Sequence, residues 1–196
     1  MNDQNDTETT RGAAVASSRL FGLPSFYGGR VFRSRLEARW AVYFNLIGFP
    51  TVGYESEGFA LDAGNYLPDF HDSRTYPYGH ESQKGGTFVE VKPTMDGFLD
   101  CLPKLQELSL KAKAAVVCVI GYPSPKPFPA FIEGQEVCNA AFTWYGYTRK
   151  GWLEPYWTED YPSCEKSENA ARIAARVKFN NGRLCVPNVR SEAPSK

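Results

Sequence analysis

The first run of apolar positions at helical spacing lies at residues 34–47. Its stripe consists of Leu36, Trp40, Tyr43, Phe44 and Ile47. Ser34 and Glu37 have the spacing of a capping box at the start of this run. Gly48 and Pro50 follow it and are typical of a helix end. The pattern therefore predicts a helix over 34–47.

Two further helices are predicted later in the chain. Over residues 98–113 leucines form the apolar face, and Pro103 fits the first turn, where its missing N–H costs little. The leucines are Leu99, Leu102, Leu105, Leu108 and Leu110. Over residues 167–179 small apolar residues form the packing face of a third helix. They are Ala171, Ala174, Ala175 and Val177.

Short runs rich in β-branched and aromatic residues predict strands between these helices. They cover residues 51–55, 59–62, 66–70, 87–92 and 115–121. The last run is continuously apolar and therefore belongs at the centre of a sheet. Residues 130–162 are aromatic and irregular, and we expect them to be β-rich. The core order of helix, three strands, helix and strand predicts an α/β sandwich on a mixed sheet.

Composition divides the chain into a central domain and two tails. Residues 1–18 and 187–196 are small and polar, which is typical of flexible segments. Residues 19–186 have the length of one domain, with a core at 27–121 and an accessory region at 122–186. The N-terminal segment lacks the apolar stretch of a signal peptide, and no apolar run approaches the roughly 18 residues of a membrane helix.

Charge and cysteine content narrow the cellular setting. The formal net charge is +0, which argues against a non-specific coat on nucleic acid but leaves room for a locally basic site. The 5 cysteines lie far apart and include no C-x-x-C pair. Their odd number and wide spacing favour reduced thiols in the cytoplasm over a disulfide framework or a zinc cluster.

The strand predicted over residues 87–92 carries two charges on one face. Because a strand has a side-chain period of two, Glu90 and Lys92 point to one side and Val89 and Val91 to the other. Opposite charges on a buried strand are costly unless something there uses them. This strand is therefore the first candidate for a functional site.

Other carboxylates complete a possible ligand set. Asp69 ends the preceding predicted strand, and Glu37 lies one turn into the first helix. With Glu90 and the backbone carbonyl of Val91 they offer the oxygen ligands that hard divalent cations prefer. A metal ion held in this way can neutralise a phosphodiester and activate water, and a nearby lysine can offset developing negative charge.

Pro68-Asp69, followed about twenty residues later by Glu90-Val91-Lys92, resembles the PD-(D/E)xK signature of restriction-endonuclease-like nucleases. The predicted element order is similar to the αβββαβ core of that family, and a helical glutamate such as Glu37 occurs in a subset of it. Residues 32–41 and the Ala/Arg-rich stretch 170–179 are similar to small bacteriophage-encoded nucleases.

This resemblance implies an Mg²⁺- or Mn²⁺-dependent endonuclease acting on DNA. Asp69, Glu90 and the Val91 carbonyl would hold the metal, and Glu37 would be an auxiliary ligand or water holder. Lys92 would act on the attacking water or on the transition-state charge. Three arginines would steer the phosphate backbone: Arg33, Arg35 and Arg39. The sequence further predicts no membrane association and a cytoplasmic location, in the host cell if the protein is phage-encoded, and a homodimer is one option.

Each of these residues also has a plain structural interpretation. Glu37 can serve only as a helix cap, Asp69 as a turn residue, and Glu90 with Lys92 as a solvated pair on an edge strand. The arginines can be a solvated helix end. The aromatic residues within 144–161 fit an accessory core better than a base-stacking surface. A non-catalytic DNA- or protein-binding module is the competing function, and a structural assembly protein is a third.

Overall fold

The computed structural model describes residues 23–49, 53–73, 85–145, 150–156 and 164–185. For residues 137–145, 150–156 and 184–185 it describes the course of the backbone. The predicted tails at 1–18 and 187–196 lie outside the described residues. The side chains of the aromatic run within 144–161 lie outside them as well, so both interpretations of that run stay predictions.

The centre of the molecule is a seven-stranded sheet with the order β11-β10-β9-β8-β7-β6-β3. Its strands are β3 (Gly53–Tyr54), β6 (Phe70–Asp72), β7 (Thr87–Lys92), β8 (Ala115–Ile120), β9 (Phe128–Ile132), β10 (Gln135–Tyr145) and β11 (Lys150–Tyr156). β7 and β8 run parallel, and all other neighbours in this sheet are antiparallel. The predicted mixed α/β class is confirmed.

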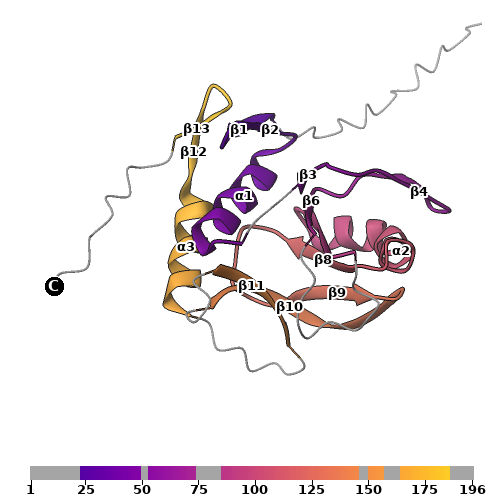
Figure 1. Ribbon diagram of the computed structural model, residues 1–196. Helices are drawn as coiled ribbons and strands as arrows, with labels where there is room; N and C mark the ends of the chain where they lie inside the picture. Colours follow the sequence, from indigo (N-terminus) through magenta and orange to yellow (C-terminus); the bar gives the residue numbers. More distant parts are fainter. Residues whose placement is uncertain (1–22, 50–52, 74–84, 146–149, 157–163, 186–196) are drawn as a thin grey trace, which may run out of the picture.

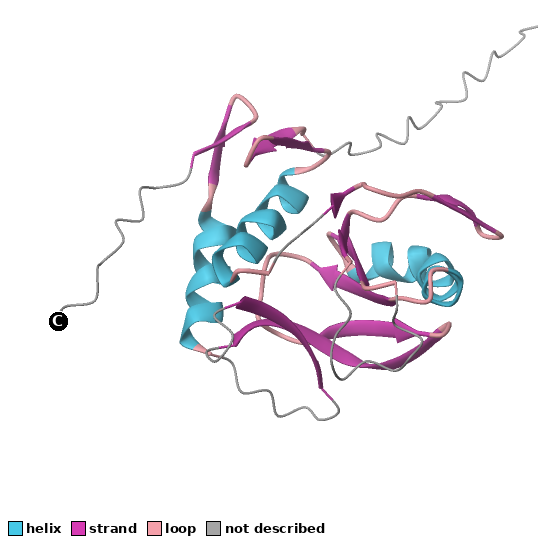
Figure 2. Cartoon of the chain, in the orientation of Figure 1, coloured by secondary structure: helices cyan, strands magenta, loops and turns pink. Residues whose placement is uncertain are grey.

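Helices cover both faces of this sheet (Figures 1 and 2). α1 (Arg35–Ile47) and α3 (Glu165–Arg176) lie side by side on one face, where Trp40, Phe44 and Val89 share a buried cluster. α2 (Met95–Lys111) lies on the other face and makes the crossover that a parallel β7–β8 pair requires. There Leu105 and Phe88 share a second cluster with the hairpin formed by β4 (Phe59–Leu61) and β5 (Gly64–Tyr66).

A second sheet joins segments from both ends of the described chain. Its strand order is β12-β13-β1-β2. The strands are β1 (Ser25–Tyr27), β2 (Arg30–Phe32), β12 (Lys178–Asn180) and β13 (Arg183–Cys185). β1 and β2 contact α1, so this sheet lies next to the helix that carries Glu37. The sequence pattern did not predict it, because three-residue strands are too short to show alternation.

α1 has the boundaries that its sequence predicts. Ser34 is the N-cap in extended backbone and its side chain accepts a hydrogen bond from the Glu37 N–H. Gly48 ends the helix in the left-handed conformation at φ 70°, where a residue without Cβ is favoured. Both signals are local, which explains why the prediction was accurate.

α2 differs from its prediction in position and in its buried face. It begins at Met95 after the N-cap Thr94, so Pro103 lies inside the helix rather than in the first turn. Phe98 and Cys101 point into the core, whereas the predicted core residues Leu99 and Leu110 are 54% and 60% exposed. Leu105 and Leu108 of the predicted face are buried as expected, and Phe98 and Cys101 join them in the hydrophobic cluster beneath the sheet.

The predicted strand over 66–70 was also wrong. Tyr66 ends β5 in the hairpin, and the sheet strand β6 begins at Phe70, so Asp69 precedes a strand instead of ending one. Gly86 allows the sheet to continue into β7, because at φ 79° its hydrogen lies where a Cβ would be 2.1 Å from the Asp72 carbonyl oxygen. The predicted β-rich character of 130–162 is confirmed for β9, β10 and β11.

Candidate functional site

The site forms where β7 extends past its neighbour β6. The two strands pair from Asp72 and Thr87 to Phe70 and Val89, and β6 has no residues further along. At that point the Val91 N–H donates to Asp69 Oδ2 over 2.7 Å. The Asp69 side chain therefore accepts the hydrogen bond that Val91 would otherwise donate to a neighbouring strand.

The Val91 carbonyl faces the same way as its N–H, because both groups of one strand residue point to one side. The carbonyl of the next residue, Lys92, faces β8 and accepts from the Gly121 N–H at 2.8 Å. The alternation therefore places the Val91 carbonyl on the side of Asp69. This is the orientation that the predicted backbone ligand needs.

Glu90 and Lys92 share one face of β7, as the strand period predicts. Lys92 Nζ lies 2.6 Å from Glu90 Oε1. Glu90 is 4% exposed, and within the described residues its Oε2 is buried with no hydrogen-bond partner. The interpretation as a solvated surface pair is therefore wrong, because the carboxylate lies in the interior.

Lys92 stays protonated in this arrangement. Burial disfavours its ammonium, but the charge and the hydrogen bond of Glu90 outweigh burial and raise the Lys92 pKa above its ordinary value. A lysine held in the charged form can stabilise negative charge but has no lone pair with which to take a proton.

Arg33 holds Asp69 from the opposite direction. Its Nη2 lies 2.7 Å from Asp69 Oδ1, and its Nε pairs with the Glu55 carboxylate. Asp69 is 3% exposed. Burial, followed by the charges of Glu90 and Glu37, raises the Asp69 pKa well above its ordinary value, although Val91 and Arg33 act in the opposite direction. Glu90 and Glu37 are thus close enough to disfavour the ionisation of Asp69.

Glu37 connects the start of α1 to this cluster and is fully hydrogen-bonded. Its Oε1 accepts from the Ser34 hydroxyl at 2.7 Å. Its Oε2 accepts from the Arg33 N–H at 3.1 Å and from the Tyr54 hydroxyl at 2.5 Å. Burial and the bond to Glu37 raise the Tyr54 pKa. The Glu37 side chain therefore takes part in the helix cap and also binds Tyr54.

The three carboxylates do not form a ready metal cage. Among the described residues, no group of three or more His, Cys, Asp or Glu side chains is placed to hold a metal ion. Glu37 is engaged by Ser34, Arg33 and Tyr54, and its role as an auxiliary ligand or water holder stays a prediction. The remaining donors are Asp69, Glu90 and the Val91 carbonyl.

Two of the three predicted phosphate-binding arginines lie away from the acids. The Arg39 guanidinium sits over the rings of Tyr122 and Phe179, at 5.1 and 5.0 Å from their centroids, and donates to the Val177 carbonyl. Arg35 lies over Phe179 at 5.8 Å. Arg33 alone of the three reaches the cluster. Whether any of them contacts nucleic acid stays a prediction.

Sequence reasoning missed two tyrosines at the site. Tyr54 reaches Glu37 from β3, and Tyr66 approaches Glu90 from the β4–β5 hairpin. Neither lies at a fixed spacing from its acid, so no motif could have found them. A partial signal existed for Tyr66, since it lies two residues before Pro68-Asp69 in a short extended segment.

Comparisons with known protein families, curated proteins and solved structures find no match for this chain. The resemblance to PD-(D/E)xK nucleases therefore rests on the residues and their arrangement alone. In the part of the chain that the structure describes, no helix has the length and apolar content needed to cross a bilayer.

Proposed function

We propose that the protein is a metal-dependent endonuclease that hydrolyses DNA phosphodiester bonds, on a restriction-endonuclease-like fold. The observation that carries this proposal is the pair of buried carboxylates where β7 extends past β6. Asp69 and Glu90 are 3% and 4% exposed, and Glu90 Oε2 has no hydrogen-bond partner among the described residues. The order α1, β3, β6, β7, α2, β8 supports the fold assignment.

The available donors fit a hard divalent cation. Asp69, Glu90 and the Val91 carbonyl are oxygen ligands, and such ligands suit Mg²⁺ or Mn²⁺ better than softer metals. Bound there, the ion would neutralise the phosphate and lower the pKa of a water molecule. To bind the ion, Asp69 Oδ1 would have to give up its contact with Arg33. Glu90 Oε2 is buried and has no regular hydrogen bond to give up.

The side chains around the metal would have separate roles in the hydrolysis. In hydrolysis the oxygen of water bonds to phosphorus, the bond to the ester oxygen breaks, and that oxygen gains a proton. Lys92, kept protonated by Glu90, would stabilise the negative charge that builds on the phosphate. We assign Glu37 to holding Tyr54 and the Arg33 backbone, rather than to the metal.

Arginines at the start of α1 would bind the DNA backbone. Arg35 is exposed and next to the N-cap of α1, and Arg33 is 54% exposed along its side chain. Arg33 contacts Asp69 directly, so a phosphate bound near it would lie next to the acids. We assign Arg39 to packing, because its guanidinium is held between two rings. Such an enzyme would process DNA in the cytoplasm.

A non-catalytic DNA-binding module is the second candidate, and one observation favours it. Asp69 and Glu90 are each paired with a cation, Arg33 and Lys92 respectively, so two charges are balanced without a metal. The binding-module hypothesis does not explain why Glu90 Oε2 is buried with no regular hydrogen bond, whereas the nuclease proposal makes this oxygen a metal ligand.

DNA cleavage assays separate the two candidates. The protein is incubated with supercoiled plasmid, linear duplex, single-stranded and branched DNA, in Mg²⁺, Mn²⁺ or EDTA. We expect cleavage that requires metal and that Asp69→Ala and Lys92→Ala abolish. Binding of DNA without metal-dependent cleavage of any substrate would favour the module instead.

A further inference from the structure

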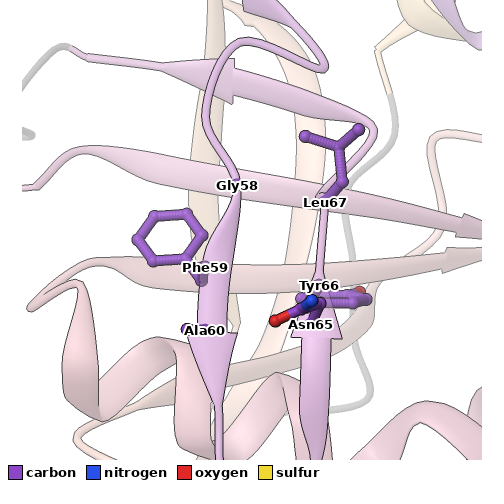
Figure 3. Close-up of a pocket in the computed structure, with 6 residues that line it drawn as sticks. All are labelled: Gly58, Phe59, Ala60, Asn65, Tyr66 and Leu67. Atoms are coloured by element: carbon purple, nitrogen blue, oxygen red, sulfur yellow. The ribbon is translucent and has the colours of Figure 1, made fainter.

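The hydroxyl of Tyr66 is buried at the site, next to the Glu90 carboxylate. Tyr66 ends β5, and its ring packs with the cluster beneath α2. Within the described residues its Oη completes no hydrogen bond of regular geometry. Figure 3 shows Tyr66 beside Phe59 on the neighbouring strand. Both residues line an open pocket of about 380 Å³.

Burying a phenol whose hydroxyl completes no regular hydrogen bond lowers the stability of the folded protein. Leaving such a group unsatisfied costs about 1–3 kcal/mol, and phenylalanine would avoid this cost. Phe59 is the cross-strand partner of Tyr66 and packs its ring on Phe88, so this side of the hairpin accommodates phenylalanine. The hydroxyl therefore needs an explanation beyond packing.

The groups that face this hydroxyl are those of the site. After burial, the charge of Glu90 and a hydrogen bond with its side chain contribute most to the raised pKa of Tyr66, followed by Cys101 and Asp69. Glu90 is also the residue whose Oε2 is buried with no regular hydrogen bond among the described residues. The phenol, a donor, and the carboxylate, an acceptor, thus lie close together without completing a hydrogen bond of regular geometry.

The hairpin that carries Tyr66 is anchored to α2. Glu107 accepts from the N–H groups of Asp62 and Ala63 at the hairpin turn, at 2.5 and 3.1 Å. Lys111 donates to the Ala60 carbonyl, and Lys104 Nζ lies 5.8 Å from the centroid of the Tyr66 ring. Such anchoring fixes where the phenol points, which a residue that orients another group requires.

We propose that Tyr66 is a positioning residue for a divalent metal ion at this site, and that its hydroxyl orients the Glu90 carboxylate as a ligand. This inference rests on the proposed function. Carboxylates that bind metals are commonly held by hydrogen bonds from neighbouring groups, and loss of such a group typically lowers metal affinity about 10–100-fold. Tyr66 adds the β4–β5 hairpin to the elements that build the site.

The test compares Mn²⁺ affinity and stability in the full chain. Mn²⁺ binding is measured by calorimetry for the wild type, Tyr66→Phe and Tyr122→Phe, and unfolding in urea is followed in EDTA. Tyr122 is an exposed tyrosine whose ring contacts Arg39, so its variant removes a hydroxyl away from the acids. We expect Tyr66→Phe to weaken Mn²⁺ binding about 10–100-fold without loss of stability, and Tyr122→Phe to change neither.

The outcomes separate this inference from the proposed function. If the wild type binds Mn²⁺ and Tyr66→Phe binds it equally well, the role of Tyr66 is wrong while the metal site stands. If Tyr66→Phe lowers stability and leaves Mn²⁺ affinity unchanged, the hydroxyl is structural and the inference is again wrong. If the wild type binds no Mn²⁺, the proposed function fails, and the inference fails with it.

Discussion

The two sides of the site differ in how completely their polar atoms are satisfied. On the α1 side, Glu37 accepts hydrogen bonds from Ser34, from the Arg33 backbone and from Tyr54. On the α2 side, Glu90 has one oxygen paired with Lys92, and neither its other oxygen nor the buried Tyr66 hydroxyl completes a hydrogen bond of regular geometry. Both statements concern the residues that the structure describes.

This difference indicates which side of the site binds a ligand. Fully bonded groups rigidify a fold, whereas an unsatisfied buried group costs stability and is retained where something else uses it. The α1 side is therefore the support of the site, and the α2 side is the part that meets a ligand. Variants on the two sides should accordingly change different measured quantities.

The largest effect is expected for Lys92→Ala, on the α2 side. Loss of a charge that stabilises the transition state should lower the rate of DNA cleavage at least about 100-fold. The measurement is single-turnover cleavage in Mg²⁺, with Lys126→Ala as the matched control because that lysine is exposed. Equal rates for the two variants would remove Lys92 from the mechanism.

Matched glutamate variants test the comparison itself. Glu90→Gln should weaken Mn²⁺ binding at least about 10-fold, because it removes a ligand charge. Glu37→Gln should lower the free energy of unfolding by about 1–3 kcal/mol with little effect on Mn²⁺, because it disrupts the cap and the bond to Tyr54. Calorimetry and urea unfolding supply the two readouts. The reverse pattern would mean that the roles of the two sides are exchanged.

Asp69 should make stability depend on pH in a defined direction. Its pKa in the folded protein is raised above 3.8, so between pH 3.8 and the folded pKa the folded state holds more protons than the unfolded state. Stability should therefore fall as pH rises through that window, by about 1.4 kcal/mol for each pH unit between the two pKa values.

Replacement of Asp69 by Asn should remove this dependence. Urea unfolding of wild type and Asp69→Asn is compared in EDTA across the acidic to neutral range. The difference between the two curves should change with pH in favour of Asp69→Asn as the pH rises. A difference that stays constant would show that Asp69 ionises as it does in the unfolded chain.

The smallest effect is expected for the arginine that we assign to packing. Arg39→Met should lower the free energy of unfolding by about 1 kcal/mol, because the cation–π contacts with Tyr122 and Phe179 are lost. Its affinity for duplex DNA, measured by fluorescence anisotropy in EDTA, should stay within about two-fold, whereas Arg35→Met should weaken it and lower its salt dependence. If Arg39→Met lost affinity for duplex DNA, Arg39 would contact DNA and its assignment to packing would be wrong.

The sequence predicted those features that depend on near neighbours. The α1 boundaries follow from Ser34 and Gly48, and the shared face of Glu90 and Lys92 follows from the strand period. These signals lie within a few residues of the structure that they determine. They were therefore readable without knowledge of the tertiary structure.

Features that depend on distant contacts could not be predicted. The pairing of Arg33 with Asp69, the bond from Tyr54 to Glu37 and the approach of Tyr66 to Glu90 all join different elements. The buried face of α2 was predicted only in part for the same reason: Leu105 and Leu108 are buried as expected, but the exposure of Leu99 and Leu110 depends on what packs against the helix. The start of β6 after Asp69 depends on pairing with β7, which is equally non-local.

The most direct test of the central claim is the position of a metal ion. Crystals of the protein grown or soaked with Mn²⁺ would be measured at a wavelength where manganese scatters anomalously. We predict an anomalous peak between the carboxylates of Asp69 and Glu90, with Arg33 displaced from Asp69 Oδ1. A structure with no peak there, and with the Arg33–Asp69 and Lys92–Glu90 pairs intact at saturating Mn²⁺, would contradict the account.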